Sequence, residues 1–375
     1  MEKSSRKDQR VLSINTSKTM RIGIMGTRGI PNEYGGFEQF AMHFAQFLVE
    51  EGVEVVVYNS SSHPFKESSW KGVEIVRCWD PEKWIGSAGQ FVYDLGAVIH
   101  ARKQQFDVLF QLGYTSSSIW GFLFPKKTII ITNMDGQEWK RAKYGKLVKK
   151  FLKRAEKWAV NQSDILIADS RGIQEYLSEE YAIDSQFIAY GANLIQQFDS
   201  NVPKKYKLIP KKYNLVIARM EPENNIETII RGHRKNRDEK LVVVGNMNTP
   251  YGKYLSKLYA DSVVFLGPNY NFEELNSLRY YSNLYFHGHS VGGTNPSLLE
   301  AMACGCQIVA HNNPFNRDVL EDNALYFSSY QELRDLLDSG LRPHENSVNK
   351  NKEKLEQVYS FKHVHHSLKE LIDNA

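Results

Sequence analysis

The chain has 375 residues, of which 42% are hydrophobic, 12% aromatic and 24% charged, and its formal net charge is +4. This composition is typical of globular proteins, and the length suggests two domains of ordinary size. The small net charge gives no support for nucleic-acid binding. Three cysteines without CxxC spacing argue against a disulfide framework or a zinc site and favour a reducing cytoplasm.

The first eighteen residues are polar and contain no apolar segment of the kind found in secretory signals. We therefore expect a disordered leader over residues 1–18. No stretch of the sequence reaches the ~18 consecutive apolar residues that a membrane-spanning helix needs. These features predict a cytoplasmic protein without a membrane span.

Short apolar runs alternate with helical patterns through the first half of the chain. Residues 21–25 predict a strand, residues 26–36 a glycine-rich loop and residues 37–50 a helix. Further strands are predicted at residues 53–58, 107–111, 128–132, 164–168 and 186–189. Such alternation is typical of βαβ units and a parallel sheet. We expect a Rossmann-like α/β domain over residues 19–195.

A prolyl and basic segment, residues 196–210, interrupts this alternation and predicts a linker. Strands are then expected at residues 213–218, 240–244, 262–266, 283–287, 307–310 and 324–327. They predict a second Rossmann-like α/β domain over residues 211–358, followed by an amphipathic helix over residues 359–375. Ligand sites in such domains lie at the carboxyl ends of the strands, which we expect to face each other across a cleft.

The segment after the strand at residues 283–287 has the features of an anion site. A glycine-containing turn leads to Asn295, a suitable N-cap, and to Pro296, a suitable first helical residue. The helix is expected to end at Gly305. Free backbone N–H groups and the positive end of the helix dipole would face a ligand here. The donor-binding residues predicted in this turn are Gly292, Gly293, Thr294 and Asn295.

Glu300 is a carboxylate in the otherwise apolar run LLEAMA. A buried carboxylate is costly unless it accepts hydrogen bonds, and ribose hydroxyls would be suitable donors. The alternative is a helix residue that faces solvent or caps an N–H group. The pattern alone does not separate these two interpretations.

These residues resemble a known family. PSLLEAMACG is similar to the second half of the Glu-x7-Glu motif of glycosyltransferase family 4, retaining enzymes with the GT-B fold. GTRGIPNEYGGFE together with TNMDGQEW resembles the N-terminal domain of bacterial β-1,4-rhamnosyltransferases that build cell-wall and capsular polysaccharides. The resemblance spans roughly residues 20–370. It implies two Rossmann-like domains, with the C-terminal helix crossing back to the first one.

The resemblance also implies roles for single residues. Arg219 takes the place of the arginine that binds the diphosphate, and Glu300 that of the glutamate that binds the ribose. An ion pair with Glu221 or Glu223 is the alternative for Arg219. Asn193 lies where the family has an Asn-Gly motif. The sequence departs from the family in two places: Gly292 stands where the first glutamate of the motif is expected, and Asn224 where a lysine is expected.

The glycine-rich loop at residues 26–36 lacks both the G-x-G-x-x-G and the GxxxxGK[ST] spacing, which disfavours a dehydrogenase or a P-loop enzyme. We expect Gly35 and Gly36 to offer backbone N–H groups to the donor, and Arg28 to offer a charge. The alternative is a flexible loop that caps its own helix.

Asp135 and Glu138 follow the strand predicted at residues 128–132. Asp135 is expected to orient the acceptor hydroxyl or the sugar, and its alternative is a turn residue in NMDG. With Arg219 and Glu300 it completes the predicted catalytic set. No Asp-x-Asp motif occurs, so neither a metal nor another cofactor is expected.

Residues 140–157 predict a helix with nine basic residues, Glu156 as its single acidic residue, and an apolar stripe. We expect its basic face to bind the anionic inner face of the cytoplasmic membrane; the alternative is a solvated helix. The residues predicted to face the membrane are Lys146, Lys149, Lys150, Lys153 and Arg154.

The predicted function is transfer of a sugar, by resemblance L-rhamnose from dTDP-rhamnose, to a polyprenyl-diphosphate-linked saccharide. A transferase that uses another nucleotide sugar, such as UDP-glucose or UDP-GlcNAc, remains an alternative. A GT-B nucleotide-sugar epimerase and a non-catalytic nucleotide-sugar binder are the other two.

Overall fold

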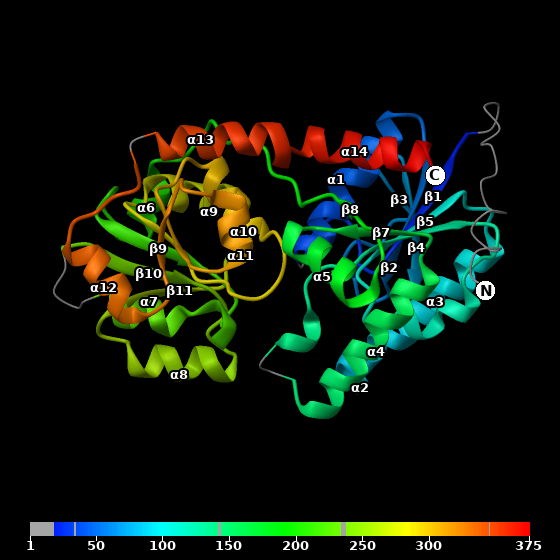
Figure 1. Ribbon diagram of the computed structural model, residues 1–375, viewed down its shortest axis with the longest axis horizontal. Coiled ribbons are helices and arrows are strands. Elements are labelled where there is room, and N and C mark those ends of the chain that lie inside the picture. Colours follow the sequence, from blue (N-terminus) through cyan, green and yellow to red (C-terminus); the bar gives the residue numbers. More distant parts are fainter. Residues whose placement is uncertain (1–18, 34, 142–143, 234–237, 345) are drawn as a thin grey trace. The chain divides into compact units, whose positions relative to one another are not determined.

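The structure is a computed structural model that describes residues 19–33, 35–141, 144–233, 238–344 and 346–375. The expected leader, residues 1–18, lies outside the described residues. The chain divides into two compact units (Figure 1). The first comprises the described residues up to Trp139, together with Tyr144–Ile188 and His365–Ala375, and the second comprises Ala189–Val364 with Lys140 and Arg141.

The first unit is built on one sheet whose strands follow the order β3-β4-β2-β1-β5-β6-β7-β8. All neighbours in it are parallel except the β3–β4 pair. The strands are β1 (Arg21–Met25), β2 (Glu54–Ser60), β3 (Ser69–Trp70), β4 (Val73–Cys78), β5 (Val108–Leu112), β6 (Ile129–Asn133), β7 (Ile165–Ala168) and β8 (Gln186–Phe187).

Helices cover this sheet and bury aromatic side chains against it. The helices are α1 (Gly36–Glu50), α2 (Glu82–Ile85), α3 (Gly89–Lys103), α4 (Lys146–Gln162) and α5 (Arg171–Tyr181), with 3₁₀ turns at Gly86–Ala88, Ser118–Leu123 and Glu138–Lys140. Phe44 of α1 packs on Phe110 of β5 with ring centroids 5.7 Å apart. His365 of the C-terminal helix α14 (Phe361–Asp373) packs on Phe44 in turn, at 5.6 Å.

The second unit has a parallel sheet in the order β11-β10-β9-β12-β13-β14. Its strands are β9 (Tyr213–Ile217), β10 (Lys240–Val244), β11 (Val263–Gly267), β12 (Tyr285–His287), β13 (Ile308–His311) and β14 (Leu325–Phe327). Its helices are α6 (Asn201–Lys205), α7 (Ile226–Gly232), α8 (Pro250–Leu258), α9 (Phe272–Tyr281), α10 (Pro296–Ala303), α11 (Pro314–Leu320), α12 (Tyr330–Asp338) and α13 (Ser347–Lys354), with a 3₁₀ turn at Pro222–Asn224 and a π turn at Leu355–Tyr359.

The expectation of two parallel α/β sheets is confirmed, and every strand predicted from the sequence is present within two residues of its expected bounds. Three details differ. Strands β3 and β4 were not predicted, because β4 lies next to the sheet edge and carries charged residues among its apolar ones. The expected linker contains α6. The basic helix begins at Lys146 rather than at residue 140.

Among the described residues, no helix is both long enough and apolar enough to span a membrane.

Candidate functional site

In the second unit, the loop between β12 and α10 forms the predicted strand–turn–helix. Asn295 caps α10, and its side-chain oxygen accepts a hydrogen bond from the backbone N–H of Ser297 at 2.9 Å. Pro296 is the first helical residue, and Gly305 follows the helix with φ +68°. The N-terminal turn of α10 therefore presents N–H groups that the helix itself does not use.

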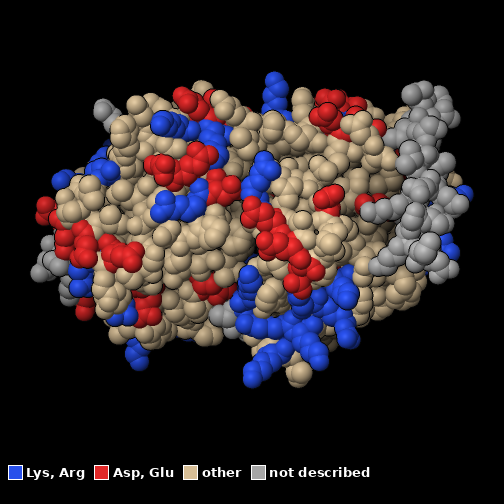
Figure 2. Space-filling model, in the orientation of Figure 1, with Lys and Arg blue, Asp and Glu red and all other residues tan. Residues whose placement is uncertain are grey.

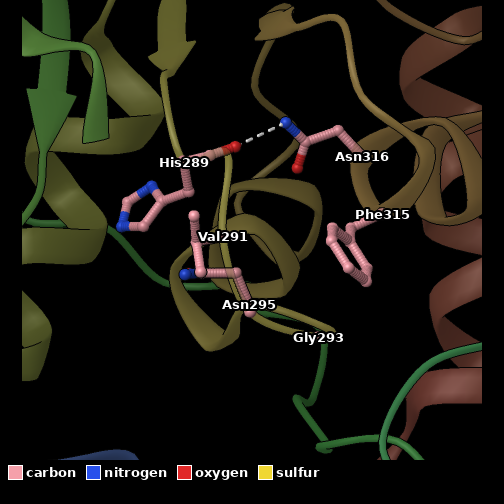
Figure 3. Close-up of a pocket in the computed structure, with 7 residues that line it drawn as sticks. His289, Val291, Gly293, Asn295, Phe315 and Asn316 are labelled. Atoms are coloured by element: carbon pink, nitrogen blue, oxygen red, sulfur yellow. Dashed lines mark hydrogen bonds between the residues drawn. The ribbon is translucent and has the colours of Figure 1, made fainter. Parts of the chain in front are cut away.

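Two asparagines from the neighbouring loop and helix fix this turn, and Figure 3 shows one of them, Asn316. The backbone oxygen of His289 accepts hydrogen bonds from the side-chain amides of Asn313 and Asn316, both at 3.0 Å. Asn313 is also the N-cap of α11, because its side chain accepts from the N–H of Asn316 at 3.1 Å. The turn is thus tied to α11 before any ligand binds.

The loop after β9 holds the turn from the other side. The oxygen of Glu223 accepts from both the N–H and the hydroxyl of Ser290, at 3.1 and 2.8 Å. The side chain of Asn225 donates to the oxygen of Gly288 at 2.9 Å. A Cβ atom at Gly288 would lie 2.2 Å from the oxygen of Asn224, so only glycine permits this approach of the two loops.

A small, shallow hollow opens beside this turn (Figure 3). It is lined by His289, Val291, Gly292, Gly293, Asn295, Phe315 and Asn316. The free N–H groups at the helix N-terminus make an anionic group the best fit for this hollow.

The backbone explains why a glycine stands at position 292. Gly292 has φ +116°, which side chains rarely adopt, while a Cβ atom there would meet nothing within 4 Å. The constraint is thus conformational rather than spatial. A glutamate would fit this position only if the backbone of the turn changed its conformation. The positive φ of the turn therefore explains why residue 292 carries no carboxylate.

Arg219 lies in the loop after β9 with 65% of its side chain exposed, and its Nη2 is 3.8 Å from Oε2 of Glu221. The ion pair considered as an alternative for Arg219 is therefore present. A long exposed side chain can still turn toward an anion, because surface ion pairs contribute little stability. Asn224 is buried and donates to the oxygen of Arg219 at 2.8 Å. Its side chain holds the loop that carries the arginine.

Glu300 lies one turn into α10, and it is paired with an arginine that the sequence analysis missed. Arg279 of α9 is 1% exposed, and its Nη2 contacts Oε2 of Glu300, whose side chain is 14% exposed. The sequence around Arg279 is typical of a helix and gave no indication that this arginine is buried. The carboxylate therefore does not simply face solvent, as one interpretation of the sequence proposed.

The motif HGHS brings two histidine rings into the same turn. The rings of His287 and His289 stack with centroids 4.4 Å apart. Burial, and then the nearby charge of Arg219, lower the pKa of His289 to about 3. Burial lowers the pKa of His287 well below its usual range. Both rings are therefore neutral at physiological pH and add no positive charge to the turn.

In the first unit, side chains of the same domain hold two residues of the glycine-rich loop, Arg28 and Ile30. Asn59 accepts from the N–H of Ile30 at 3.1 Å and donates to its oxygen at 2.7 Å. Glu38 accepts from the N–H of Arg28 at 2.8 Å. Helix α1 begins at Gly36 with Gly35 as its N-cap. The contacts with Asn59 and Glu38 hold Ile30 and Arg28 in place.

Arg28, the charge predicted to contact the donor, makes a two-pronged ion pair with Glu82 of α2. One of its two bonds, from Nη2 to Oε1, measures 2.8 Å. A bidentate pair of this kind orients the guanidinium firmly. A ligand would have to share Arg28 with this carboxylate.

Asp135 lies after β6 at φ +44°, and its N–H donates to the side chain of Asn133 at 3.0 Å. This is the turn geometry considered as its alternative. Asp169, which the sequence analysis missed, follows the adjacent strand β7 and is 1% exposed. Burial, and next the charge of Asp135, raise the pKa of Asp169 well above its usual range. Two carboxyl groups thus interact at one edge of the first sheet.

The other two predicted contact residues are Glu138 and Asn193. Glu138 begins a 3₁₀ turn and is half-buried, whereas Asn193 is exposed. In the second unit, Arg219, Gly292 and Asn295 lie at one edge of the sheet. Glu300 lies one helical turn along α10 from Asn295. Asp135 and Arg28 occupy the corresponding edge of the first sheet.

Basic side chains gather over the N-terminal part of α4 (Figure 2). Lys146, Lys150 and Arg154 are exposed and Lys149 is half-buried, beside Leu147, whose side chain is 85% exposed. Lys140 lies in the 3₁₀ turn before α4, and Lys143 lies outside the described residues.

Lys153, which was also predicted to face the membrane, is half-buried and has partners within the first unit. Its Nζ lies 3.1 Å from Oε1 of Glu156 and 3.0 Å from Oε1 of Glu180. The faces of Trp139, Tyr176 and Tyr181 surround it at 4.8 to 5.1 Å. This ammonium group is committed to the first unit, because two carboxylates and three rings already hold it.

Two family models match the chain, one for each half. Residues 19–193 match a domain of unknown function, DUF1972, and residues 198–357 match the glycosyl transferases group 1. An uncharacterized glycosyltransferase of Methanocaldococcus jannaschii is 26% identical over 233 residues, which is 56% of this chain and 58% of the relative. The chain thus spans little more than half the length of that relative.

Solved structures share the fold along nearly the whole chain. A sucrose-phosphate synthase of Thermosynechococcus elongatus superposes with a TM-score of 0.77 at 15% identity, over 94% of this chain and 98% of that one. HepE of Anabaena, determined with UDP-glucose, superposes with a TM-score of 0.72 at 14% identity, over 96% and 100%. The chain therefore has the GT-B fold of these structures, and its second half, residues 198–357, matches the glycosyl transferases group 1.

Proposed function

We propose that the chain is a metal-independent, retaining glycosyltransferase that moves L-rhamnose from dTDP-rhamnose to a lipid-diphosphate-linked saccharide in bacterial surface polysaccharide synthesis. One observation carries the transferase assignment. The capped N-terminus of α10, its glycine turn and Arg219 form an anion site in a domain that matches the glycosyl transferases group 1. The choice of rhamnose and of the lipid acceptor is supported only by the resemblance of motifs in the N-terminal half of the chain to bacterial rhamnosyltransferases.

In this proposal the donor's diphosphate binds the N–H groups of the Gly292–Asn295 turn, and Arg219 leaves Glu221 to pair with it. Glu300 binds the ribose. The protein's main contribution is to hold the reactants and to stabilise the charge that develops on the leaving diphosphate. Since the anomeric configuration is retained, the leaving phosphate accepts the proton of the incoming hydroxyl on the same face of the sugar. Asp135 orients that hydroxyl.

The sugar itself needs a different contact from the one common in the family, because Gly292 carries no carboxylate. We propose that backbone N–H groups of the turn bind the sugar hydroxyls in its place. Neutral hydrogen bonds to backbone groups are weaker than bonds to a carboxylate. They suit a 6-deoxy sugar, which offers one hydroxyl fewer than glucose.

A donor panel tests the function. The protein is incubated with dTDP-rhamnose, UDP-glucose and UDP-GlcNAc, with and without a polyprenyl-diphosphate-linked saccharide, and released nucleotide and extended lipid are measured. We expect release that depends on the acceptor and is fastest with dTDP-rhamnose. Release or sugar conversion without an acceptor would instead favour an epimerase or hydrolase. No turnover of any donor, together with nucleotide binding, would favour a non-catalytic binder.

The variant Arg219→Met tests whether Arg219 takes part in the reaction. Arg231→Met on α7 is the control, because Arg231 is exposed in the same unit and stacks on Tyr330. We expect Arg219→Met to lower turnover by roughly 10- to 1,000-fold, since it removes a charge that the transition state uses. Equal turnover of the two variants would exclude Arg219 from the reaction.

We also propose that α4 binds the anionic inner face of the cytoplasmic membrane and so brings the enzyme to a lipid-linked acceptor. Lys146, Lys149, Lys150 and Arg154 supply the charge, and the exposed Leu147 supplies an apolar contact. Basic residues contribute about 1 kcal/mol each near such a surface. Lys153 is left out of this set for the reason given above.

Vesicle sedimentation tests this membrane contact. Reversing Lys146, Lys149, Lys150 and Arg154 to glutamate should lower binding to vesicles with 30% phosphatidylglycerol by at least roughly 100-fold. Reversing Lys253 and Lys257, exposed on α8, is the control and should change it little. If both variants sediment like the unmodified protein, α4 is a solvated helix.

A further inference from the structure

Arg279 is a fully buried arginine in the second unit, and no part of the proposed reaction uses it. It lies on α9 with 1% of its side chain exposed. An arginine cannot shed its charge by losing a proton, because its pKa is too high. A cation in such a place is costly unless its donors are paired, so its partners show what it is for.

The guanidinium fork points at the first turns of α10. Its Nη2 contacts Oε2 of Glu300 and lies 3.2 Å from the hydroxyl of Ser297. Its Nη1 donates to the side chain of Asn276 at 3.0 Å. The Ser297 hydroxyl is held in turn by the phenol of Tyr285 at 2.8 Å. These contacts fix the guanidinium in one orientation, and through it they fix the carboxylate.

The pairing uses one oxygen of Glu300. Among the described residues, Oε1 makes no hydrogen bond, and the side chain retains 14% exposure. A carboxylate has about four acceptor positions, so one oxygen bound to an arginine leaves the other for a ligand.

We propose that Arg279 is a positioning residue for nucleotide binding, which holds the Glu300 carboxylate so that Oε1 accepts hydrogen bonds from ribose hydroxyls. This inference rests on the proposed function, in which Glu300 binds the ribose. The competing explanation is a purely structural ion pair, in which Glu300 serves only to neutralise Arg279. The two explanations differ in one measurable property, the discrimination between nucleotides with and without ribose hydroxyls.

The experiment uses the full chain and titration calorimetry with two probe pairs: UDP with 2′,3′-dideoxy-UDP, and dTDP with 2′,3′-dideoxythymidine diphosphate. Hydrogen bonds to a carboxylate should make the hydroxylated member of a pair bind roughly 10- to 100-fold more tightly. In Arg279→Lys, which keeps the charge but loses the fork, we expect this ratio to fall to within about threefold of one. The affinity for the dideoxy probes should stay within about threefold of the unmodified protein.

Two further variants make the result interpretable. Arg231→Lys is the matched control on an exposed arginine and should keep the full ratio. Glu300→Gln should bring the ratio of the two affinities, hydroxylated over dideoxy nucleotide, close to one. If Glu300→Gln abolishes it and Arg279→Lys keeps it, the role proposed for Arg279 is wrong while the ribose role of Glu300 stands.

If Glu300→Gln keeps the ratio, Glu300 does not bind the ribose and this inference is overturned, whereas the donor panel decides separately whether the protein is a transferase. Thermal unfolding shows whether Arg279→Lys folds. If it does not, Ser297→Ala removes only the neutral partner at 3.2 Å and should reduce the ratio partially. An undiminished ratio in that variant would also count against the proposal.

Discussion

Glu156 of α4 is a buried carboxylate on which five donors converge, and its replacement by glutamine gives a sharp test of the first unit. It is 2% exposed. Oε1 accepts from Tyr176 and Tyr181, both at 2.5 Å, and from Lys153 at 3.1 Å. Oε2 accepts from Trp139 at 3.1 Å and from Tyr114 at 3.2 Å. The carboxylate thus connects α4, α5 and the turn after β6.

Glutamine has nearly the same shape but only one accepting oxygen. If its NH₂ group replaces Oε2, it faces the indole N–H of Trp139, which can only donate. If its NH₂ group replaces Oε1, it faces the ammonium of Lys153, which also can only donate. Either orientation therefore leaves a donor-only group against another donor. Tyrosine hydroxyls can turn and accept, but the indole and the ammonium cannot.

The expected cost follows from these contacts. Losing the charge weakens five hydrogen bonds, and each bond to a charged group contributes ~1.5–3 kcal/mol. Because Lys153 is partly exposed and the tyrosines can reorient, we expect a net loss of about 3–5 kcal/mol in the unfolding free energy of the first unit. This corresponds to a fall in its melting temperature on the order of 10 °C.

Scanning calorimetry measures the effect, with Glu180→Gln as the control. Glu180 also contacts Lys153, at 3.0 Å, but its side chain is 45% exposed, so its replacement should shift the transition by no more than about 2 °C. Glu156→Gln with a transition within 2 °C of the unmodified protein would show that the five contacts do not cooperate, and the reasoning would fail.

Three other predictions concern both units. Asn295→Ala should cost about 1 kcal/mol of stability and also weaken nucleotide binding, whereas Ser329→Ala at the N-cap of α12 should cost stability alone; equal nucleotide affinities in calorimetry would contradict this. Gly288→Ala should destabilise the second unit by about 1–3 kcal/mol, because its Cβ atom would meet the oxygen of Asn224 at 2.2 Å; an unchanged urea midpoint would refute the close approach. Burial raises the pKa of Asp94 to about 7, so the native state holds a proton that the unfolded chain loses near pH 4, and stability should fall by a few kcal/mol as pH rises from about 4 to 7. Asp94→Asn should remove this part of the pH dependence, and urea unfolding at pH 4.5 and 7.5 checks it.

Local patterns predicted the fold well because the elements of a parallel α/β sheet are defined by short stretches of chain. The apolar run at β12, the cap at Asn295 and the stop at Gly305 each act within a few residues, and all three are present in the structure. Strand β4 was missed since its charged residues obscure the apolar pattern near a sheet edge. The expected helix start at residue 140 was wrong because charge and periodicity do not mark where a helix begins.

The roles of charged side chains depended on partners that are distant in the sequence. Glu300 could face solvent or a ligand by its pattern, and only the packing of α9 on α10 paired it with Arg279. Lys153 has the sequence context of a surface lysine, and only the tertiary structure places its ammonium group against the rings of Tyr176 and Tyr181.

The sequence by itself therefore determined the two sheets and the capped turn before α10, with Gly292 in that turn and Asn224 in the loop after β9, because these follow from the preferences of neighbouring residues. The tertiary structure decided which charges are available to a ligand. A charge is neutralised, oriented or left free by groups that folding brings together, and no local pattern contains that information.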